Sequence, residues 1–339
     1  MIATPKLSIG LAVYNGENYL AEALDSLLSQ TFGDFELIVS DNASYDATEA
    51  ICRDYAARDS RVRYVRQERN RGAAWNFSET FRLSRGEYFK WAAHDDLHAD
   101  TFLARCVERL DDDPGLALCF SRSRVIDEFG KFVPEDLGDD PRAVSFQGIS
   151  RWSEARRVAL CASHKPHERY RGVLLWSRRG YEMFGVVRRA AMRQTGLHRP
   201  FNGAEKVFLV ELSLLGRFAE IDEPLFYSRW HDRRFSANSS AVAQARHVDP
   251  SASSRFAWPR QIRSSWGYFE LIWRMPLSPW ERVGCLTVFG QYLLQFAKWK
   301  RVLHEAATGR GTSGRLPRRA PDAGAEADKF SCGDFEISN

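Results

Sequence analysis

The chain has 339 residues, of which 44% are hydrophobic and 27% are charged, and these are ordinary values for a globular protein. They exclude a wholly disordered, fibrous or polytopic membrane chain, and the length predicts one large domain with an appendage or two modest domains. Lys and Arg number 48 against 44 Asp and Glu, a formal charge of +4. That excess is too small to predict a nucleic-acid partner without a concentrated basic stripe.

The cysteines and the first residues indicate a compartment. The six cysteines form no CxxC pair, and nothing before Leu7 resembles a secretion signal. We therefore expect a reducing, cytoplasmic location. The longest uncharged stretch, Val283 to Ala297, has 15 residues. A membrane-spanning helix needs about 20 apolar residues, so we expect no span.

Between Leu7 and Phe120, short apolar runs alternate with segments of helical period, which predicts an open, mostly parallel α/β sheet. The expected strands are Leu7 to Val13, Phe35 to Ser40, Val62 to Arg66, Tyr88 to Ala93 and Leu116 to Val125. The expected helices run from Leu20 to Leu28, from Asp46 to about Ala57, from Ala73 to Leu83 and from Ala99 to Leu110.

The middle of the chain is less regular. Residues 128–179 are polar and contain Pro and Gly residues, so we expect loops there. The Ser- and Ala-rich stretch 236–254 predicts a linker or mobile loop. Between these two stretches we expect a strand at Tyr181 to Val187, a buried helix at Ala204 to Leu215 and an extended segment at Pro224 to Trp230.

Aromatic residues at helical spacing, with Lys and Arg around them, predict helices in residues 261–305. The aromatic stripe comprises Phe289, Tyr292, Phe296 and Trp299. Such a stripe usually packs in a core or a subunit contact. The alternative is a peripheral membrane contact through residues 283–301, at the inner face of the membrane. Residues 306–339 contain few large aliphatic side chains, so we expect a disordered tail.

The familiar nucleotide signatures are absent from the sequence. Gly10 and Gly16 do not form a GxGxxG fingerprint, and Gly130-Lys131 is not preceded by the first glycine of a P-loop. A phosphate ligand would therefore be held by other groups.

Asp95 and Asp96 are adjacent carboxylates at the carboxyl end of a predicted strand, where ligands of open α/β sheets bind. Two like charges this close repel each other unless a cation or ligand lies between them. A hard divalent ion such as Mg²⁺, held by one or two carboxylates, commonly also takes phosphate oxygens. The pair therefore predicts a metal-bridged diphosphate, and a solvated turn or helix cap is the alternative.

Further candidates follow the first three predicted strands. Asp41 ends the second strand, and Tyr14 and Asn15 follow the first, so these residues should line one crevice. A pocket for a base and a ribose is the functional interpretation, and an Asx turn at Asp41 is the alternative. Gly72 and Asn76 follow the third strand and are expected to approach the same ligand.

Three stretches of the chain resemble the nucleotide half of a family 2 glycosyltransferase, whose fold is GT-A. They are Ser8 to Glu17, Val39 to Thr48 and His94-Asp95-Asp96. The resemblance implies that Asp41 contacts the base and that Asp95 and Asp96, as the last carboxylates of a DxD-like motif, bind ribose and metal. His94 stands in the place of the first acid, so the division of the ribose and metal roles stays open.

Weaker resemblances follow in the second half of the chain. Asn202 to Val207 resembles the segment that supplies the family's catalytic base, usually an Asp, and this chain has Glu205 there, with Glu211 as the rival. His231 resembles a position where some GT-A enzymes place a histidine near metal or diphosphate, and a structural histidine is the alternative. Nearby arginines would pair phosphates or form a solvated surface: Arg229, Arg233 and Arg234.

The resemblance implies an α/β chain with a GT-A domain and a C-terminal helical extension. The expected domain is 1–235, with a nucleotide half at about 6–126 and an acceptor half at about 127–235. The expected remainder is a linker at 236–260, helices at 261–305 and a tail at 306–339.

The implied activity is metal-assisted transfer of a sugar from a nucleoside-diphosphate sugar, UDP-linked or otherwise, to the hydroxyl of a carbohydrate or lipid-linked acceptor. Inversion, Mg²⁺ or Mn²⁺, and bacterial surface polysaccharide or glycolipid assembly are expectations from the family. A catalytically inactive nucleotide-sugar-binding or scaffold protein is the alternative. A sugar nucleotidyltransferase would have a glycine-rich loop after the first strand, which is absent here.

Overall fold

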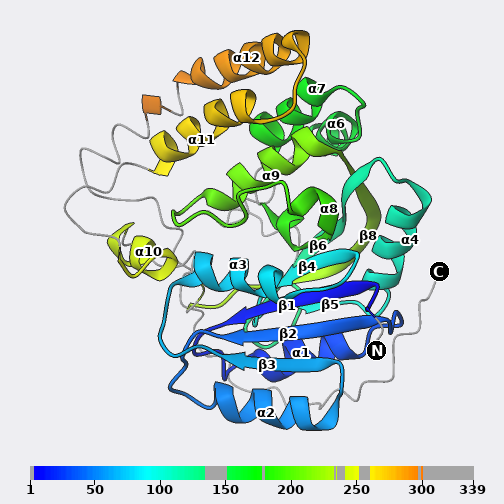
Figure 1. Ribbon diagram of the computed structural model, residues 1–339, viewed down its shortest axis with the longest axis vertical. Coiled ribbons are helices and arrows are strands. Elements are labelled where there is room, and N and C mark those ends of the chain that lie inside the picture. Colours follow the sequence, from blue (N-terminus) through cyan, green and yellow to red (C-terminus); the bar gives the residue numbers. More distant parts are fainter. Residues whose placement is uncertain are drawn as a thin grey trace.

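The computed structural model describes residues 4–133, 151–177, 180–232, 234, 241–251, 260–296 and 299–300. Within these residues one eight-stranded sheet runs through the molecule in the order β3-β2-β1-β4-β7-β6-β8-β5 (Figure 1). Its strands are β1 (Leu7–Val13), β2 (Phe35–Asp41), β3 (Val62–Arg66), β4 (Tyr88–Ala92), β5 (Leu97–His98), β6 (Leu116–Ile126), β7 (Val186–Arg188) and β8 (Arg217–Arg229).

The first four strands are parallel to one another, and this arrangement positions the site. In the register, Val13 of β1 lies opposite Asp41 of β2, so the two strands end side by side. β4 lies on the other side of β1, also in parallel. Because carboxyl ends of parallel strands meet at one edge of a sheet, the loops after β1, β2 and β4 converge there. β7 is antiparallel to its neighbours β4 and β6.

Hydrophobic cores lie on both faces of the sheet. Alternate residues of β4 point to opposite faces, so Tyr88 and Ala92 enter one core while Phe89 and Trp91 enter the other. The first core is covered by α1 (Leu20–Leu28), α2 (Thr48–Arg58) and α4 (Phe102–Asp112). The second is covered by α3 (Ala73–Leu83) and by helices of the second half of the chain.

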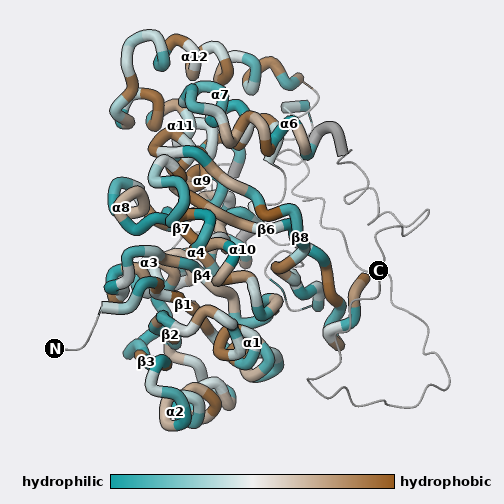
Figure 2. Tube along the Cα trace, turned by 90° about the vertical axis from the view of Figure 1, so that its right-hand side faces the viewer, coloured by the Kyte–Doolittle hydropathy of each residue, from teal (hydrophilic) through white to brown (hydrophobic). Residues whose placement is uncertain are grey.

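The second half of the chain adds a helical layer. In Figures 1 and 2, α11 and α12 lie at the end of the molecule opposite α2, and in Figure 2 hydrophobic segments follow the strands and α9. The helical elements are α6 (Arg151–Cys161), α7 (Pro166–Arg171), the π-helical turn η1 (Gly172–Trp176), the 3₁₀ turn η2 (Tyr181–Phe184), α8 (Arg189–Met192), α9 (Ala204–Leu215), α10 (Ala241–Val248), α11 (Arg260–Arg274) and α12 (Pro279–Leu293). Within the described part of the chain, no helix combines the length and the apolar composition that crossing a membrane requires.

The strands and helices expected between Leu7 and Val125 are confirmed with small shifts of their ends, and β5 is an addition. The expectation of loops throughout residues 128–179 is wrong, because α6, α7 and η1 lie there. Polar pairing masks the helical pattern of α6: the buried Arg157 forms ion pairs with Glu154, Glu182 and Glu220.

The strand expected at Tyr181 to Val187 is wrong over its first part, which is the 3₁₀ turn η2. Gly180 has a left-handed φ of 72° and begins that turn, and β7 follows only from Val186. The extended segment expected at Pro224 to Trp230 is the last part of β8.

Within the stretch expected to be a linker, residues 241–248 form helix α10. The expected helix at Ala204 to Leu215 and the expected C-terminal helices are confirmed. In the aromatic stripe, Tyr292 is buried, and Phe289 and Trp299 pack against the second core, as the core interpretation predicts. Phe296 is exposed. The expected tail at 306–339 lies outside the described residues.

Candidate active site

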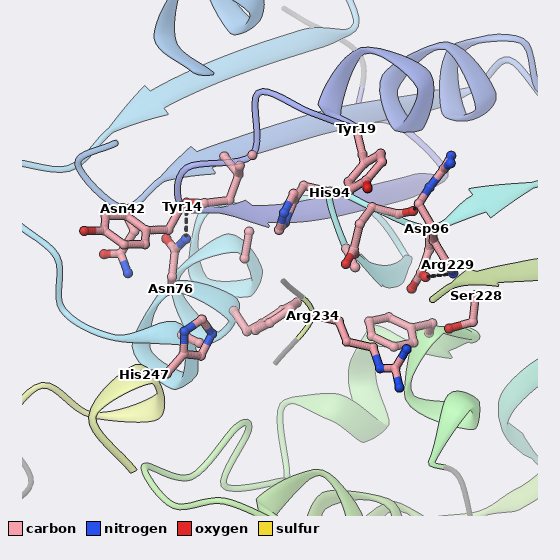
Figure 3. A pocket seen from close by; sticks show the side chains of 18 of the residues that line it. Tyr14, Tyr19, Asn42, Asn76, His94, Asp96, Ser228, Arg229, Arg234 and His247 are labelled. Carbon is pink, nitrogen blue, oxygen red and sulfur yellow. Dashed lines mark hydrogen bonds between the residues drawn. The ribbon is translucent and has the colours of Figure 1, made fainter. Parts of the chain in front are cut away.

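A cavity of about 430 Å³ opens where β1, β2 and β4 end (Figure 3). The nucleotide-half side chains that line it come from the loops after these strands and from α3. The opposite wall comes from η2, the start of α9, the end of β8 and α10. Among the candidates named from the sequence, the lining residues are Tyr14, Asn15, Asn76, Asp95, Asp96, Glu205, Arg229, His231 and Arg234.

Asp41 does not line the cavity. Its carboxylate is fully buried, with one oxygen accepting from the Ser44 backbone amide at 2.8 Å and the other from the Tyr64 hydroxyl at 2.7 Å. This is the Asx turn that was the alternative interpretation. Each Asp41 oxygen thus accepts one hydrogen bond inside the fold, whereas the neighbouring residue Asn42 lines the cavity.

Gly72 also lies outside the cavity lining. Its φ is +87°, and a Cβ atom added there would lie 2.3 Å from the carbonyl oxygen of Val248. Gly72 therefore provides room for the end of α10 rather than for a ligand. Asn76 does line the cavity, but its amide nitrogen donates to the carbonyls of Val13 and Ser40. It thus joins the ends of β1 and β2.

Asp95 is paired with His231. Nε2 of His231 lies 3.0 Å from Oδ2 of Asp95, and the imidazole packs on the ring of Tyr19 with centroids 4.7 Å apart. Burial alone would raise the pKa of Asp95, but His94 and His231 outweigh it and lower that pKa below its usual value. Asp95 is therefore an anion with one oxygen in a hydrogen bond.

Asp96 lies in a different environment from its neighbour. Its Oδ1 accepts from the backbone amide of Arg229 at 3.0 Å, and only 6% of the residue is exposed. Burial, reinforced by the charge of Asp95, raises the pKa of Asp96 to about 8. Two adjacent carboxylates thus have pKa values shifted in opposite directions, a pattern that marks functional sites.

Arg229 holds this region together. Its fully buried guanidinium donates to the carbonyl of Asp95 at 2.9 Å and to the carbonyl of Glu128 at 3.2 Å, and it pairs with Glu22 of α1 at 2.6 Å. The alternative that Arg229 lies on a solvated surface is therefore wrong, and Arg229 lines the cavity. Arg234 also lines the cavity and stacks over Trp230, and Arg233 lies outside the described residues.

Asp95 and Asp96 have the oxygen ligands that a hard divalent cation prefers. The described residues contain no group of three or more His, Cys, Asp or Glu arranged as metal ligands. However, Mg²⁺ and similar ions are usually held by one or two carboxylates, with substrate phosphates and waters completing the shell. In addition, the buried Nδ1 of His231 has no hydrogen-bond partner among the described residues, so this ring can bind a further ligand.

Glu205 and its rival Glu211 lie in different places on α9. Glu205 is in the first turn, after Gly203 with a left-handed φ of 94°, and its side chain lines the cavity. Glu211 is fully buried outside the cavity, where it accepts from the Gly196 amide at 3.0 Å and pairs with Arg274. Of the two, only Glu205 can reach a ligand in the cavity.

Sequence reasoning missed several lining residues, most notably histidines. His94 was read only as a replacement for an acid, yet it points into the cavity. Gly16 makes this possible, because a Cβ there would lie 2.7 Å from Cδ2 of His94. Other missed lining residues are Tyr19, Asn42, Asn70, Tyr181, Phe184, His198, Asn202, Trp230, His247 and Val248. Asn42 and Asn202 lie in stretches that resemble the family, whereas the others are revealed only by their positions in the fold.

The raised pKa of Asp96 predicts a pH-dependent stability. In the unfolded chain the pKa of Asp96 is about 4, and below that pH the contribution of Asp96 to the stability of the folded protein is at its maximum. That contribution is lost as the pH rises toward 8, the pKa of Asp96 in the folded protein. Asp96→Asn keeps an oxygen for the Arg229 amide and never becomes charged. We therefore expect the free energy of unfolding of the Asp96→Asn variant, relative to that of the native protein, to increase between pH 5 and pH 8 by up to about 1.4 kcal/mol per pH unit.

Urea unfolding in EDTA at both pH values measures this difference. Asp222→Asn is the control, because the Asp222 side chain is 80% exposed and its substitution should give no such trend. A difference between the Asp96 variant and the native protein that stays constant with pH would show that burial does not shift this carboxyl.

Comparisons with known proteins agree with this geometry. Residues 8–171 match the model of the family described as glycosyl transferase family 2. A putative glycosyltransferase of Bacillus subtilis, EpsH, is 28% identical over 50% of this chain and 52% of its own length. An uncharacterized glycosyltransferase of Rickettsia typhi is 40% identical over 28% of this chain and 29% of its own length. The chain thus spans about half or less of the length of these curated relatives.

Solved structures share the fold. TarS residues 1–349 of S. aureus, in complex with UDP-GlcNAc, gives a TM-score of 0.57 at 17% identity over 85% of this chain and 71% of that chain. The mannosyltransferase PcManGT of Pyrobaculum calidifontis, in complex with GDP-Man and Mn²⁺, gives 0.51 at 16% identity over 91% of this chain and 80% of that chain. Residues 8–171 of the chain therefore match glycosyl transferase family 2, and the fold of the chain is GT-A.

Proposed function

We propose that this chain transfers a sugar from a nucleoside-diphosphate sugar to an acceptor hydroxyl. The observation that supports this most is that one cavity contains both the buried acidic pair with His231 and the single carboxylate of Glu205. A cation site and a separate base are what such a transfer requires. The two structural neighbours bind UDP-GlcNAc and GDP-Man, which supports a donor of the same class for this chain.

In the proposed mechanism, Asp95, Asp96 and His231 would hold Mg²⁺ or Mn²⁺. When bound, the ion neutralises the negative charge that develops on the departing diphosphate. The cavity positions the acceptor so that its oxygen bonds to the anomeric carbon as the bond from that carbon to the phosphate oxygen breaks. Glu205 accepts the hydroxyl proton. A single displacement from the opposite face inverts the anomeric carbon.

The main competing function is donor binding without transfer. The replacement of the usual Asp base by Glu and of the first motif acid by His94 would suit an inactive protein. Two features favour an enzyme: Glu205 lies in the cavity, and the pKa values of Asp95 and Asp96 shift in opposite directions. Hydrolysis of nucleotide sugars by the purified chain with Mn²⁺ would distinguish the two functions.

Asp96→Ala tests the cation site. Loss of this carboxylate removes a proposed metal ligand, and metal stabilisation of a leaving group is worth several kcal/mol. We expect the metal-dependent turnover of nucleotide sugars to fall by about 100-fold or more. The control is Asp222→Ala, whose side chain is exposed and outside the cavity lining. Native turnover in the Asp96 variant would contradict the assignment.

Glu205→Gln tests the base. Glutamine keeps the shape of the side chain but cannot accept the proton, so we expect kcat to fall by roughly 10²- to 10⁴-fold while the donor Kd stays close to native. Single-turnover transfer and calorimetric donor binding measure the two quantities. Glu211→Gln is the control, because it removes a carboxylate from the same helix at a position that does not line the cavity. An unchanged kcat in Glu205→Gln would remove the base assignment.

For the acceptor we propose a carbohydrate or lipid-linked hydroxyl in bacterial surface polysaccharide or glycolipid assembly. The chain would then work in the cytoplasm, with peripheral membrane contact through residues 283–301. Four apolar side chains in this range are exposed and support the contact: Val283 by 53%, Leu293 by 44%, Leu294 by 63% and Phe296 by 73%. Apolar side chains at a helix surface bind the lipid headgroup region.

Flotation with anionic vesicles tests this contact. The native protein should float with the lipid, and the double variant Leu294→Ser and Phe296→Ser should float less, because buried apolar area contributes to interfacial binding. Phe129→Ser is the matched control, since Phe129 is 78% exposed in a loop after β6. Equal flotation of the three proteins, or none by the native protein, would rule out the contact.

A further inference from the structure

Helix α10 forms one wall of the cavity, although it lies well beyond the sheet in the sequence. His247 and Val248 of α10 line the cavity. Figure 3 shows His247 on the side of Tyr14, Asn42 and Asn76, with Asp96 and Arg229 at the opposite side. The cavity therefore has an end that α10 covers and an end that the acidic pair occupies.

Contacts on two sides fix α10 at this place. Its last residue, Val248, packs against Gly72 at the start of α3. A Cβ atom added at Gly72 would lie only 2.3 Å from the Val248 carbonyl oxygen. On the other side, the side-chain amide of Asn202 donates to the side-chain oxygen of Gln244 at 2.5 Å. Asn202 immediately precedes the turn that begins α9 and presents Glu205. The helix thus connects both halves of the cavity.

The chemistry of the covered end differs from that of the acidic end. Its described lining residues have neutral amides and flat rings, including Tyr14, Asn42, Asn70, Asn76 and His247. The Asn42 amide donates to Asn70 at 2.9 Å, so these two side chains are held in place. Burial, reinforced by His94, lowers the pKa of His247, so its neutral ring offers one donor and one acceptor. Such a surface suits a flat, uncharged, polar group rather than a phosphate.

We propose that α10 is part of the donor site and that His247 contacts the base or ribose of the nucleoside. This inference rests on the proposed function, because the acidic end must hold the diphosphate for the nucleoside to occupy the covered end. The proposal adds His247 to the donor site, although sequence patterns assign the segment that contains His247 to a linker. The wall that α10 supplies makes donor affinity depend on residues far from any family motif.

Two substitutions test the proposal by different routes. His247→Ala removes the contacting ring directly. Gly72→Ala lies outside the cavity lining but forces α10 away, because the added Cβ meets the Val248 carbonyl and φ is +87°. Gly33→Ala is the control, since an added Cβ there meets nothing within 4 Å. His247→Gln keeps a donor and an acceptor and should restore part of any loss.

The probes are UDP and GDP, and inorganic pyrophosphate as a ligand without a nucleoside, each titrated calorimetrically with Mn²⁺. We expect His247→Ala and Gly72→Ala to weaken binding of the preferred nucleoside diphosphate by roughly 3- to 10-fold, which corresponds to the loss of a hydrogen bond. Pyrophosphate should bind all variants as it binds the native protein. Circular dichroism confirms folding of each variant, and if Gly72→Ala does not fold, the two His247 variants decide.

The outcomes distinguish a failure of the proposed function from a failure of the role of His247. A native protein that binds neither nucleotide nor pyrophosphate contradicts the proposed function itself. A native protein that binds nucleotide, together with His247→Ala that binds it equally well, overturns only the role of His247. An equal loss of nucleotide and pyrophosphate affinity in His247→Ala also overturns it, because the effect would then not be on the nucleoside.

Discussion

The arrangement of the site depends on one buried arginine. The guanidinium of Arg229 connects the loop after β4, the loop after β6 and helix α1, while its backbone amide fixes Asp96. A buried guanidinium must be paired to be tolerated, so these partners cannot separate without a large energetic cost. Arg229 thus keeps the two adjacent carboxyl groups in place while the pKa of Asp96 remains raised. The geometry of the proposed cation site is therefore fixed before any ligand binds.

The two ends of the cavity differ in their chemistry. Asp95, Asp96 and Glu205 carry its acidic groups, whereas the wall under α10 consists of amides and rings. A nucleoside-diphosphate sugar has the same division, with a charged diphosphate between two neutral polar groups. The family match and the shared fold are consistent with such a ligand.

Sequence patterns predicted the parallel part of the sheet because β1, β2 and β4 are buried on both faces and because α1 and α4 have simple apolar stripes. Asp95, Asp96 and Glu205 were found because each lies at a strand end or helix start that resembles a family motif. Asp41 and Gly72 follow the same logic, yet tertiary contacts with Tyr64 and Val248 occupy them. Arg229 and α6 were misread because ion pairing inside the fold hides charged residues from any hydrophobic pattern.

The position of α10 affects how this chain should be divided for study. The family match ends at residue 171, and the domain expected from the sequence ends at 235, but the cavity wall continues to Val248. A shortened protein that stops at either boundary would expose Gly72, the edge of α3 and the side chain of Asn202 to water. Crystallisation or screening of such a fragment would examine an opened cavity rather than the one that the whole chain forms.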